Sequence, residues 1–352
     1  SGANLSVGTG NLSGVFSGAV AGDAGLIKLG SGSLELAGIN VYTGSTQVNG
    51  GVLNVSGSLA SPVVQVNSGA TLTGSGQVAG AVSVADGGHL AVNSGANLGL
   101  GSLVLSSNSN LDLGLGSPAT GGNALITVGG NLTLDGKLNV SDIGGFGAGI
   151  YRVIDYTGVL IDNGLVIGTL PSGVLPGDLE VQVAISNQVN LLVGGANGSV
   201  LFWDGSQQTS DNAIQGGTGT WNALNTNWTT VNGTGNRDWS SYFAVFQGTA
   251  GNVTIDGTQT VTGLQFVTDG YVLTGDALNA VNRNGGDFAV RVDPGVAAVN
   301  IGTAAGSGAV AAASAWGEVQ LEVTLSATNI VVRDVVRGTT VTAADTTYRT
   351  GL

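Results

Sequence analysis

The stretch Gly25–Val55 reads GLIKLGSGSLELAGINVYTGSTQVNGGVLNV and contains the same apolar pair twice. Leu34 and Leu36 are separated by one polar residue, and Leu53 and Val55 repeat that arrangement 19 residues later. Alternation of apolar and polar residues places every second side chain on one face of a strand. Each pair therefore predicts a short strand with one buried face, and the Gly, Asn and Ser residues between the pairs predict turns.

The pair recurs along the first third of the chain. The leucines that begin the successive units are Leu34, Leu53, Leu72, Leu90, Leu111 and Leu132. Only Leu72 lacks a Leu or Val two positions later, because Gly74 stands there. A strand that returns every ~20 residues is typical of a β-solenoid. We therefore predict an all-β chain folded as a parallel β-helix, in which the inward Leu and Val side chains of each coil stack on the coil below.

The composition is that of a strand-and-turn protein. Glycine makes up 63 of the 352 residues without a Gly-X-Y period, which excludes collagen. Apolar residues make up 42% of the chain, which argues against disorder, and charged residues only 9%, too few for helical surfaces. The net charge is −13, and the chain has only two lysines, Lys28 and Lys137. We therefore expect no nucleic-acid partner and no attraction to an anionic bilayer.

The chain contains no cysteine and no methionine. Small secreted domains usually depend on disulfides, but a solenoid with a continuous core has less need of them. The missing initiator indicates a processed product or an excised fragment. We find no signal peptide at Ser1 and no apolar run of the ~18 residues that a membrane-spanning helix requires.

We predict two parts, with a boundary near the pair Gly194-Gly195. Residues 1–195 form the β-helix, with the regular repeat in residues 1–145. Ile150–Tyr156 is a strand in the less regular stretch 149–193, which projects from the rod or packs along it. Residues 196–352 form a less regular, aromatic-rich second β segment that continues the helix or caps it, and Val319–Val336 is expected to form strands. Positive-φ corners are predicted at the Asp-Gly dipeptides that begin at Asp86, Asp135, Asp204, Asp256 and Asp269, and at the Asn-Gly dipeptides that begin at Asn49, Asn163, Asn197, Asn232 and Asn284.

The sequence offers little for catalysis. The single histidine, His89, follows Asp86 closely, which leaves a His–Asp dyad open. Its place directly before an inward leucine favours an exposed coil corner instead. One histidine and no cysteine exclude a zinc site, and the nucleophile-elbow, P-loop and H-E-x-x-H motifs are absent. We predict no catalytic residue and no cofactor-binding residue.

The acidic residues could serve two kinds of site, a calcium site and a glycan-cleaving site. Calcium loops carry regular acidic spacings that this sequence lacks, although Asp side chains on adjacent corners leave a site open. Solenoid glycosidases and lyases need clustered carboxylates, whereas the 22 acidic residues here are scattered. The only basic residues before residue 237 are Lys28, Lys137 and Arg152. We predict no metal site, and we retain a polysaccharide hydrolase or lyase as an alternative.

The tryptophans admit two interpretations. Four of the five lie within a short stretch, as Trp203, Trp221, Trp228 and Trp239. Exposed, they would form a platform for sugar rings; buried, they would fill the rim of the solenoid or the seam between two modules. Their irregular spacing favours the buried role.

A known repeat is visible in the opening stretch. Gly25–Gly44 resembles the autotransporter-associated β-strand repeat, GL-x-K-x-G-x-G-x-L-x-L-x-G-x-N-x-Y-x-G, and Gly50–Val55 is similar to the G-G-x-L-x-V that follows it. Further landmarks of large autotransporter passengers are Phe202–Gly205, Gly216–Trp221, Asn227–Thr229, Ala244–Phe246 and Asp269–Gly275. The resemblance implies a right-handed parallel β-helix on the Gram-negative cell surface, tethered through an outer-membrane barrel that lies outside this chain.

The resemblance carries no catalytic residues. It implies a non-catalytic stalk, adhesin or self-association module, either on the bacterial surface or secreted. The expected partners are host or bacterial cell-surface molecules, or identical rods that meet through free strand edges. A surface-array or filament subunit is the second alternative.

Overall fold

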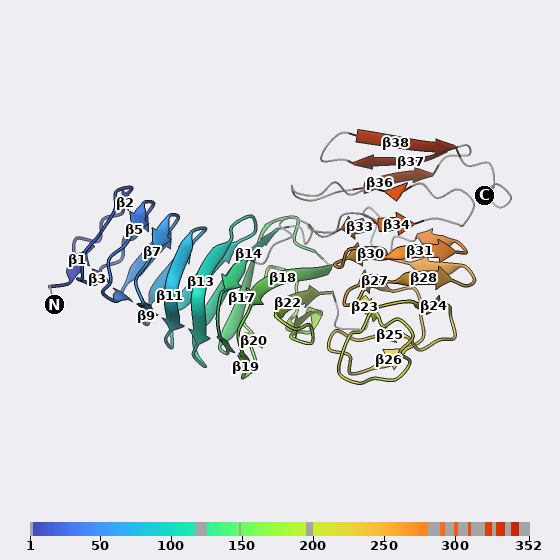
Figure 1. The fold of residues 1–352 in the computed structure, drawn as a ribbon, viewed down its shortest axis with the longest axis horizontal. Coiled ribbons are helices and arrows are strands. Elements are labelled where there is room, and N and C mark those ends of the chain that lie inside the picture. The colour runs from blue at the N-terminus through green and yellow to red at the C-terminus, as the bar shows by residue number, and fades with distance from the viewer. Residues whose placement is uncertain are drawn as a thin grey trace.

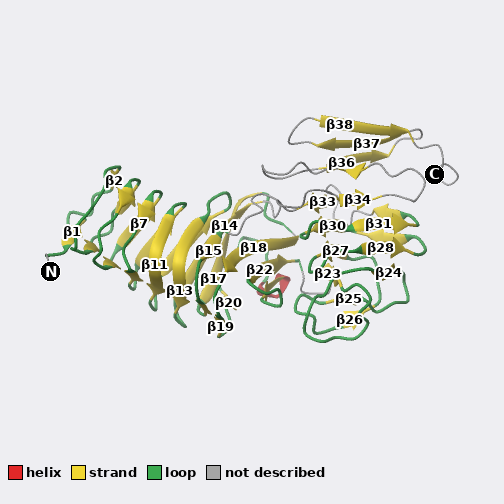
Figure 2. Ribbon diagram, viewed as in Figure 1, coloured by secondary structure: helices red, strands yellow, loops and turns green. Residues whose placement is uncertain are grey.

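The computed structural model describes residues 3–116, 125–147, 149–194 and 200–280, and beyond these the backbone of the strands between residues 289 and 344. The described chain is elongated, with its first strands at one end and the later strands at the other (Figure 1). Figure 2 shows that strands and turns dominate it, with one short 3₁₀ helix, η1 (Pro176–Asp178). The predicted all-β fold is confirmed.

Three faces of parallel strands wrap the first part of the chain. Face A holds β1 (Leu5–Val7), β3 (Leu26–Lys28), β6 (Thr46–Val48), β9 (Val63–Val66), the second halves of β11 (Gln77–Val84) and β13 (Leu98–Leu105), β16 (Leu132–Leu134) and β19 (Leu160–Asp162). Face B holds β2 (Gly14–Phe16), β4 (Ser33–Leu36), β7 (Gly51–Val55), β10 (Ala70–Gly74), β12 (His89–Asn93), β14 (Asn110–Gly116), β17 (Lys137–Gly144) and β20 (Val166–Ile167). Face C holds β5 (Ile39–Asn40), β8 (Ser58–Leu59), the first halves of β11 and β13, β15 (Ile126–Val128) and β18 (Gly149–Tyr156). This arrangement is a parallel β-helix, as predicted.

The interior is a set of stacked aliphatic columns. On face B the register runs through Leu34, Leu53, Leu72, Leu90, Leu111 and Leu138. All of these are buried, and Leu53, Leu72, Leu90 and Leu111 are 0% exposed. The sequence-based assignment of Leu132 to this column is therefore wrong: Leu132 lies on β16 and pairs with Leu103 on face A. The coil that follows Leu111 is longer than its neighbours. Counting 21 residues on from Leu111 therefore reaches Leu132 on β16, the strand before β17, which continues the column.

The corners follow the predicted turn chemistry. In all five Asp-Gly dipeptides the glycine has a positive φ, from 63° at Gly205 to 92° at Gly270. The Asn-Gly dipeptides give positive φ at Gly164 and Gly233, but at Asn49-Gly50 the prediction is wrong, because the positive φ lies one residue later, at Gly51. Asn197 and Asn284 lie outside the described residues. An L side chain rarely adopts a positive φ, and glycine does so without steric cost. These corners let each coil turn sharply enough to keep neighbouring strands in register.

The regular coils end where pairing changes direction. β18 confirms the strand predicted at Ile150–Tyr156, and it pairs antiparallel with β22 (Gln188–Val193). β22 pairs antiparallel in turn with β21 (Leu179–Gln182). These two strands extend face C and cover the end of the first core.

Parallel coils resume after residue 200. One sheet runs through β23 (Val200–Trp203), β27 (Phe243–Phe246), β30 (Gly263–Phe266) and β33 (Ala289–Val292), with the hairpin strands β25 (Trp228–Thr229) and β26 (Asn236–Arg237) beside β23. A second sheet contains β24 (Gly219–Trp221), β28 (Asn252–Ile255), β31 (Val272–Gly275), β34 (Val299–Ile301) and β35 (Ala309–Val310), and β29 (Gln259–Val261) pairs with β32 (Leu278–Ala280). β36 (Leu321–Leu325), β37 (Asn329–Asp334) and β38 (Thr339–Ala344) form an antiparallel sheet, so the strands predicted within 319–336 are confirmed at 321–325 and 329–334. The rest of that stretch lies outside the described residues. The division of the chain at residue 195 stays a prediction.

A buried junction joins the two sets of coils. Its apolar part contains Ile150, Leu192, Val200, Phe202, Ile214, Val231, Phe243 and Val245. The Gln265 side chain, fully buried, accepts the N–H of Ile150 at 2.9 Å and donates to its carbonyl at 3.1 Å. The Gln182 amide donates to the Val231 carbonyl at 2.8 Å. These contacts join segments 115 and 49 residues apart in the sequence.

Candidate functional site

Face A presents one continuous outward row without a formal charge. The paired residues, one per coil, are Ser6, Ile27, Gln47, Gln65, Ser83, Val104, Thr133 and Ile161. We call this row ladder A. All of its members are half-buried or exposed, and Val104 and Ile161 are 45% and 53% exposed. Parallel strands lie ~4.8 Å apart, so ladder A forms a regular strip of polar and aliphatic groups.

Face B carries charged side chains on its outward rows. Asp112 lies one coil from His89, and its carboxylate is 2.6 Å from His89 Nδ1. The Asn139 amide donates to the same carboxylate at 2.7 Å and to the Asn110 side-chain oxygen at 3.3 Å. As the structure describes it, this group contains an imidazole, a carboxylate and two amides, and no hydroxyl or thiol belongs to it. The group therefore offers no Ser, Thr or Cys nucleophile of the kind that acyl transfer uses.

Asp86 is not the partner of His89, and the dyad left open by the sequence does not form between them. The Asp86 carboxylate accepts hydrogen bonds from the Ser106 hydroxyl at 2.7 Å and from the Asn108 backbone N–H at 3.0 Å. The Ser106 hydroxyl, followed by the Asn108 donors, lowers the pKa of this exposed carboxyl. Asp86 therefore links the corners of two neighbouring coils.

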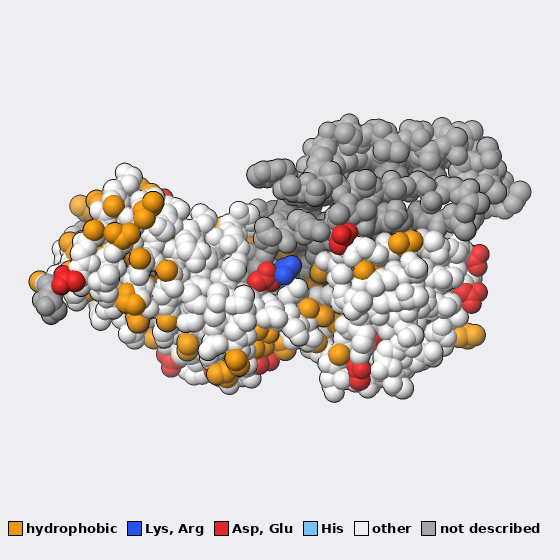
Figure 3. All heavy atoms as spheres, viewed as in Figure 1, with side chains coloured by type: hydrophobic (Ala, Val, Ile, Leu, Met, Phe, Trp, Pro, Cys, Tyr) orange, Lys and Arg blue, Asp and Glu red, His pale blue; other side chains and the backbone are white. Residues whose placement is uncertain are grey.

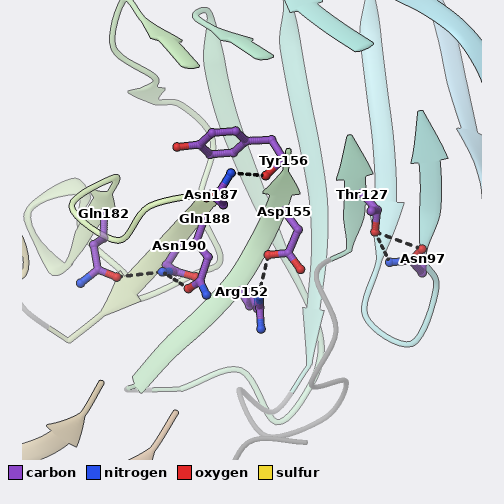
Figure 4. Close-up of polar contacts among 9 residues, drawn as sticks. All are labelled: Asn97, Thr127, Arg152, Asp155, Tyr156, Gln182, Asn187, Gln188 and Asn190. Carbon is purple, nitrogen blue, oxygen red and sulfur yellow. Dashed lines mark hydrogen bonds and ion pairs between the residues drawn. The ribbon is translucent and has the colours of Figure 1, made fainter. Parts of the chain in front are cut away.

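Several separate polar contacts lie on face C and on the strands that extend it (Figure 4). Arg152 Nε lies 2.7 Å from Asp155, and Asn97 bonds with Thr127 on the next coil at 3.0 Å. Beyond β18, the Asn190 amide donates to the side-chain oxygen of Gln182 at 2.8 Å. These contacts hold side chains in place along and between coils and form no catalytic arrangement.

Lys28 contributes little to the surface charge because it is 1% exposed. Its ammonium donates to the carbonyls of Leu29, Gly30 and Gly50 at 2.8, 3.1 and 3.0 Å. Burial lowers the pKa of the Lys28 ammonium. The lysine ties a corner of one coil to the next, which explains why a cation stands at an inward position of the repeat.

The tryptophans form the interior of the second set of coils, so the predicted buried role is confirmed. Trp203, Trp221, Trp228 and Trp239 are at most 4% exposed, and the centroids of the Trp228 and Trp239 rings lie 4.3 Å apart. Phe246 stacks on Phe266 in the same core at 4.8 Å. None of these four indoles is available as a platform for sugars.

The visible surface is mostly uncharged, with scattered apolar groups concentrated over the first coils and along one edge (Figure 3). The large apolar side chains exposed near the first coils include Leu12, Val15 and Ile39, at 80%, 67% and 67%. No group of three or more His, Cys, Asp or Glu residues that would hold a metal occurs among the described residues. In the same part of the chain, no helix has the length and apolarity needed to cross a membrane.

Comparisons with known proteins agree with the architecture. The passenger-associated transport repeat family matches residues 26–55. The chain is 41% identical over 301 residues to the adhesin BmaC autotransporter of Brucella suis biovar 1 (strain 1330), an alignment that covers 78% of this chain. It is 47% identical over 76 residues, or 22% of this chain, to an extracellular serine protease of Serratia marcescens. The alignments cover only 9% and 7% of these two relatives.

Proposed function

We propose that this chain, which is a segment of an autotransporter passenger region, acts as a rigid non-catalytic stalk whose outer ladders form an adhesive contact surface. The relatives are named as an autotransporter adhesin and an extracellular protease, and the chain is a cell-surface or secreted segment. The partners that we propose are host or bacterial cell-surface molecules, or identical rods.

Ladder A is the observation that carries the proposal. It crosses eight paired strands without a charged residue, in a chain whose net charge is −13. Two copies of such a chain repel each other over most of their surfaces, and repulsion is weakest where an uncharged strip faces the partner. Amide and hydroxyl groups at a regular spacing supply hydrogen bonds, and Ile27, Val104 and Ile161 supply apolar area.

The junction supports the stalk role. A stalk holds a contact surface at a fixed position only if its parts do not move independently, and parts joined by a linker with few contacts do move independently. Here the apolar junction and the Gln265–Ile150 pair of hydrogen bonds connect the two sets of coils. The contact surface is therefore held at a fixed place along the rod.

A non-catalytic role fits the chemistry of the described side chains. The His89–Asp112 group lacks a hydroxyl or thiol, and acyl transfer needs a nucleophile within hydrogen-bond reach of its base. The match to the serine protease covers 76 residues of that protein. Neither the hydrolase or lyase alternative nor the surface-array alternative is favoured by an observation in this structure.

Display on a non-adherent Gram-negative strain tests the proposal. Cells that carry the segment should clump or bind host surfaces more than cells with an empty passenger. The ladder A variant Gln65→Asp/Ser83→Asp/Val104→Asp, which adds three charges on successive coils, should abolish the effect. The matched control Asn54→Asp/Thr73→Asp/Ala91→Asp adds the same charges to successive coils of face B and should retain it. Equal adhesion by the ladder A variant and the unchanged segment would refute the proposal.

A further inference from the structure

Asp204 is a buried carboxylate without a cationic partner. It is 1% exposed, and none of the ion pairs among the described residues includes it. Its two oxygens accept the Gln215 backbone N–H at 2.9 Å and the Asn236 amide at 3.0 Å. Burying an ionised carboxylate is costly unless a charge compensates it, and two neutral donors supply only part of that compensation.

Several unpartnered oxygens lie on the segments that flank this carboxylate. The buried side-chain atoms that lack a hydrogen-bond partner include Asn227 Oδ1, Thr229 Oγ1, Asn236 Oδ1 and Gln215 Oε1. Asn227 is 1% exposed and Thr229 is fully buried. Buried polar atoms in native proteins nearly always have partners, so four such oxygens on the segments that flank Asp204 need an explanation.

The strand register places these groups together. Thr229 pairs with Phe202 on one side and with Asn236 on the other, and paired residues share one face of a sheet. Asn227 and Asp204 lie two residues from Thr229 and Phe202, so alternation puts them on that same face. The hydrogen bond from Asn236 to Asp204 shows that these two side chains meet, and the Asp204 N–H donates to the Asn227 carbonyl across the same pair of strands at 3.1 Å.

The hydrogen bonds that the Asn227 and Asn236 amide nitrogens donate fix the orientation of each amide. Asn227 Nδ2 donates to the carbonyls of Gly205 and Thr220 at 2.7 and 3.0 Å. Asn236 Nδ2 donates to Asp204 and to the Gln207 carbonyl at 3.0 and 3.2 Å. Turning either amide over would set oxygen against oxygen, so the side-chain oxygens remain without donors. A second carboxylate, Asp211, is held in the same loop by its contacts with Gln207 and Gln215.

We propose that Asp204, Asn227, Thr229 and Asn236, with Gln215 beside them, form a binding site for a calcium ion under the loop between β23 and β24. Calcium takes six to eight oxygen ligands from carboxylates, amide carbonyls, hydroxyls and water. The site offers carboxylate, amide and hydroxyl oxygens and lacks sulfur or imidazole, which disfavours zinc. The sequence predicted no metal, because these oxygens come from four separate short segments.

The site would bind the loop at 204–218 to the hairpin formed by β25 and β26. Both pack beside β23, whose Val200 and Phe202 belong to the junction. Calcium occupancy would then stabilise the second set of coils next to the first. This inference is independent of the adhesive surface, because ladder A shares no residue with it.

Terbium luminescence of the full chain tests the site. Terbium replaces calcium and is sensitised by nearby indoles, here Trp203 next to Asp204 and Trp228 between Asn227 and Thr229. We expect saturable binding of one ion per chain, displaced by calcium, with Asp204→Asn weakening it at least about tenfold. Asp256→Asn, which alters an exposed carboxylate, serves as the matched control and should leave the affinity unchanged.

Thr229→Val keeps the side-chain volume, so it distinguishes the loss of a calcium ligand from a folding defect. If Oγ1 has no ligand, valine removes an orphaned hydroxyl, and neither calcium affinity nor the stability of the apo chain falls. If Oγ1 is a ligand, the valine variant folds, yet binds calcium more weakly and gains less thermal stability from it. No saturable binding below about 10 mM calcium, or equal affinity for Asp204→Asn and Asp256→Asn, would overturn the inference.

Discussion

Gln265→Leu should break the connection between the two sets of coils. The Gln265 amide satisfies both the N–H and the carbonyl of Ile150, at 2.9 and 3.1 Å, inside a junction where both residues are at most 2% exposed. Leucine is similar in size but cannot form either bond. Each orphaned buried backbone group costs about 1–3 kcal/mol, so we expect a loss of about 2–6 kcal/mol in the free energy of unfolding.

Urea denaturation provides the assay. Tryptophan emission reports the second set of coils, which contains Trp203, Trp221, Trp228 and Trp239, and far-UV circular dichroism reports the whole chain. In the unchanged protein the junction should hold the two transitions close together. In Gln265→Leu the emission transition should move to lower urea and separate from the dichroism transition.

Gln247→Leu is the matched control. Gln247 is 1% exposed and Gln265 is 0% exposed, but neither amide atom of Gln247 has a hydrogen-bond partner. Replacing it should be neutral or stabilising, since no bond is lost and a buried polar group is removed. If Gln265→Leu costs no more than Gln247→Leu, the reasoning about the junction is refuted.

Three further predictions concern the first coils. Leu72 is fully buried in the face B column, so Leu72→Ala should lower the free energy of unfolding, measured by urea denaturation, by about 2–5 kcal/mol. The outward Thr71→Ala should change it by less than about 0.5 kcal/mol. Equal losses for the two variants would contradict the stacked column. Lys28→Met should lower the free energy of unfolding by at least about 2 kcal/mol, because three carbonyls lose a charged donor. Lys137→Met, on the exposed end of β17, should leave that free energy nearly unchanged. If Lys28→Met also left it unchanged, the three carbonyls would need no donor. Burial raises the pKa of the Tyr42 hydroxyl to about 12, so the folded chain holds that proton more tightly than the unfolded chain. The resulting contribution to the free energy of unfolding is complete below pH 10 and is lost as the pH rises from 10 to 12. Tyr42→Phe should measurably reduce this loss of stability between pH 10 and 12.

Local sequence patterns predicted the stacking correctly in the part of the chain where successive coils have nearly the same length. Leu34, Leu53, Leu72, Leu90 and Leu111 stack as expected, because the alternation and the step of about 20 residues are both written in the sequence. Leu132 was assigned to the wrong face, because one longer coil shifts the phase and the sequence does not mark which strand is displaced.

The pairings between coils had no local signal. His89 was matched in the sequence with the nearby Asp86, but its carboxylate partner is Asp112, 23 residues away on the next coil. Asp204 was predicted as a turn residue and, like Asn227, belongs to a landmark of autotransporter passengers, but no local pattern marks these residues or Asn236 as ligands. A neighbour across coils lies one full turn away in sequence, and small differences in coil length decide which residue that is.

The amino-acid sequence alone determined the β-helix, the positive-φ corners and the burial of the tryptophans, since each depends on alternation, turn chemistry or hydrophobicity within a few residues. Only the tertiary structure decided which outward side chains line up in ladder A, how Gln265 reaches Ile150, and which oxygens gather around Asp204. These depend on register, and register is the cumulative result of every coil length before it, so it becomes visible only when the coils are stacked.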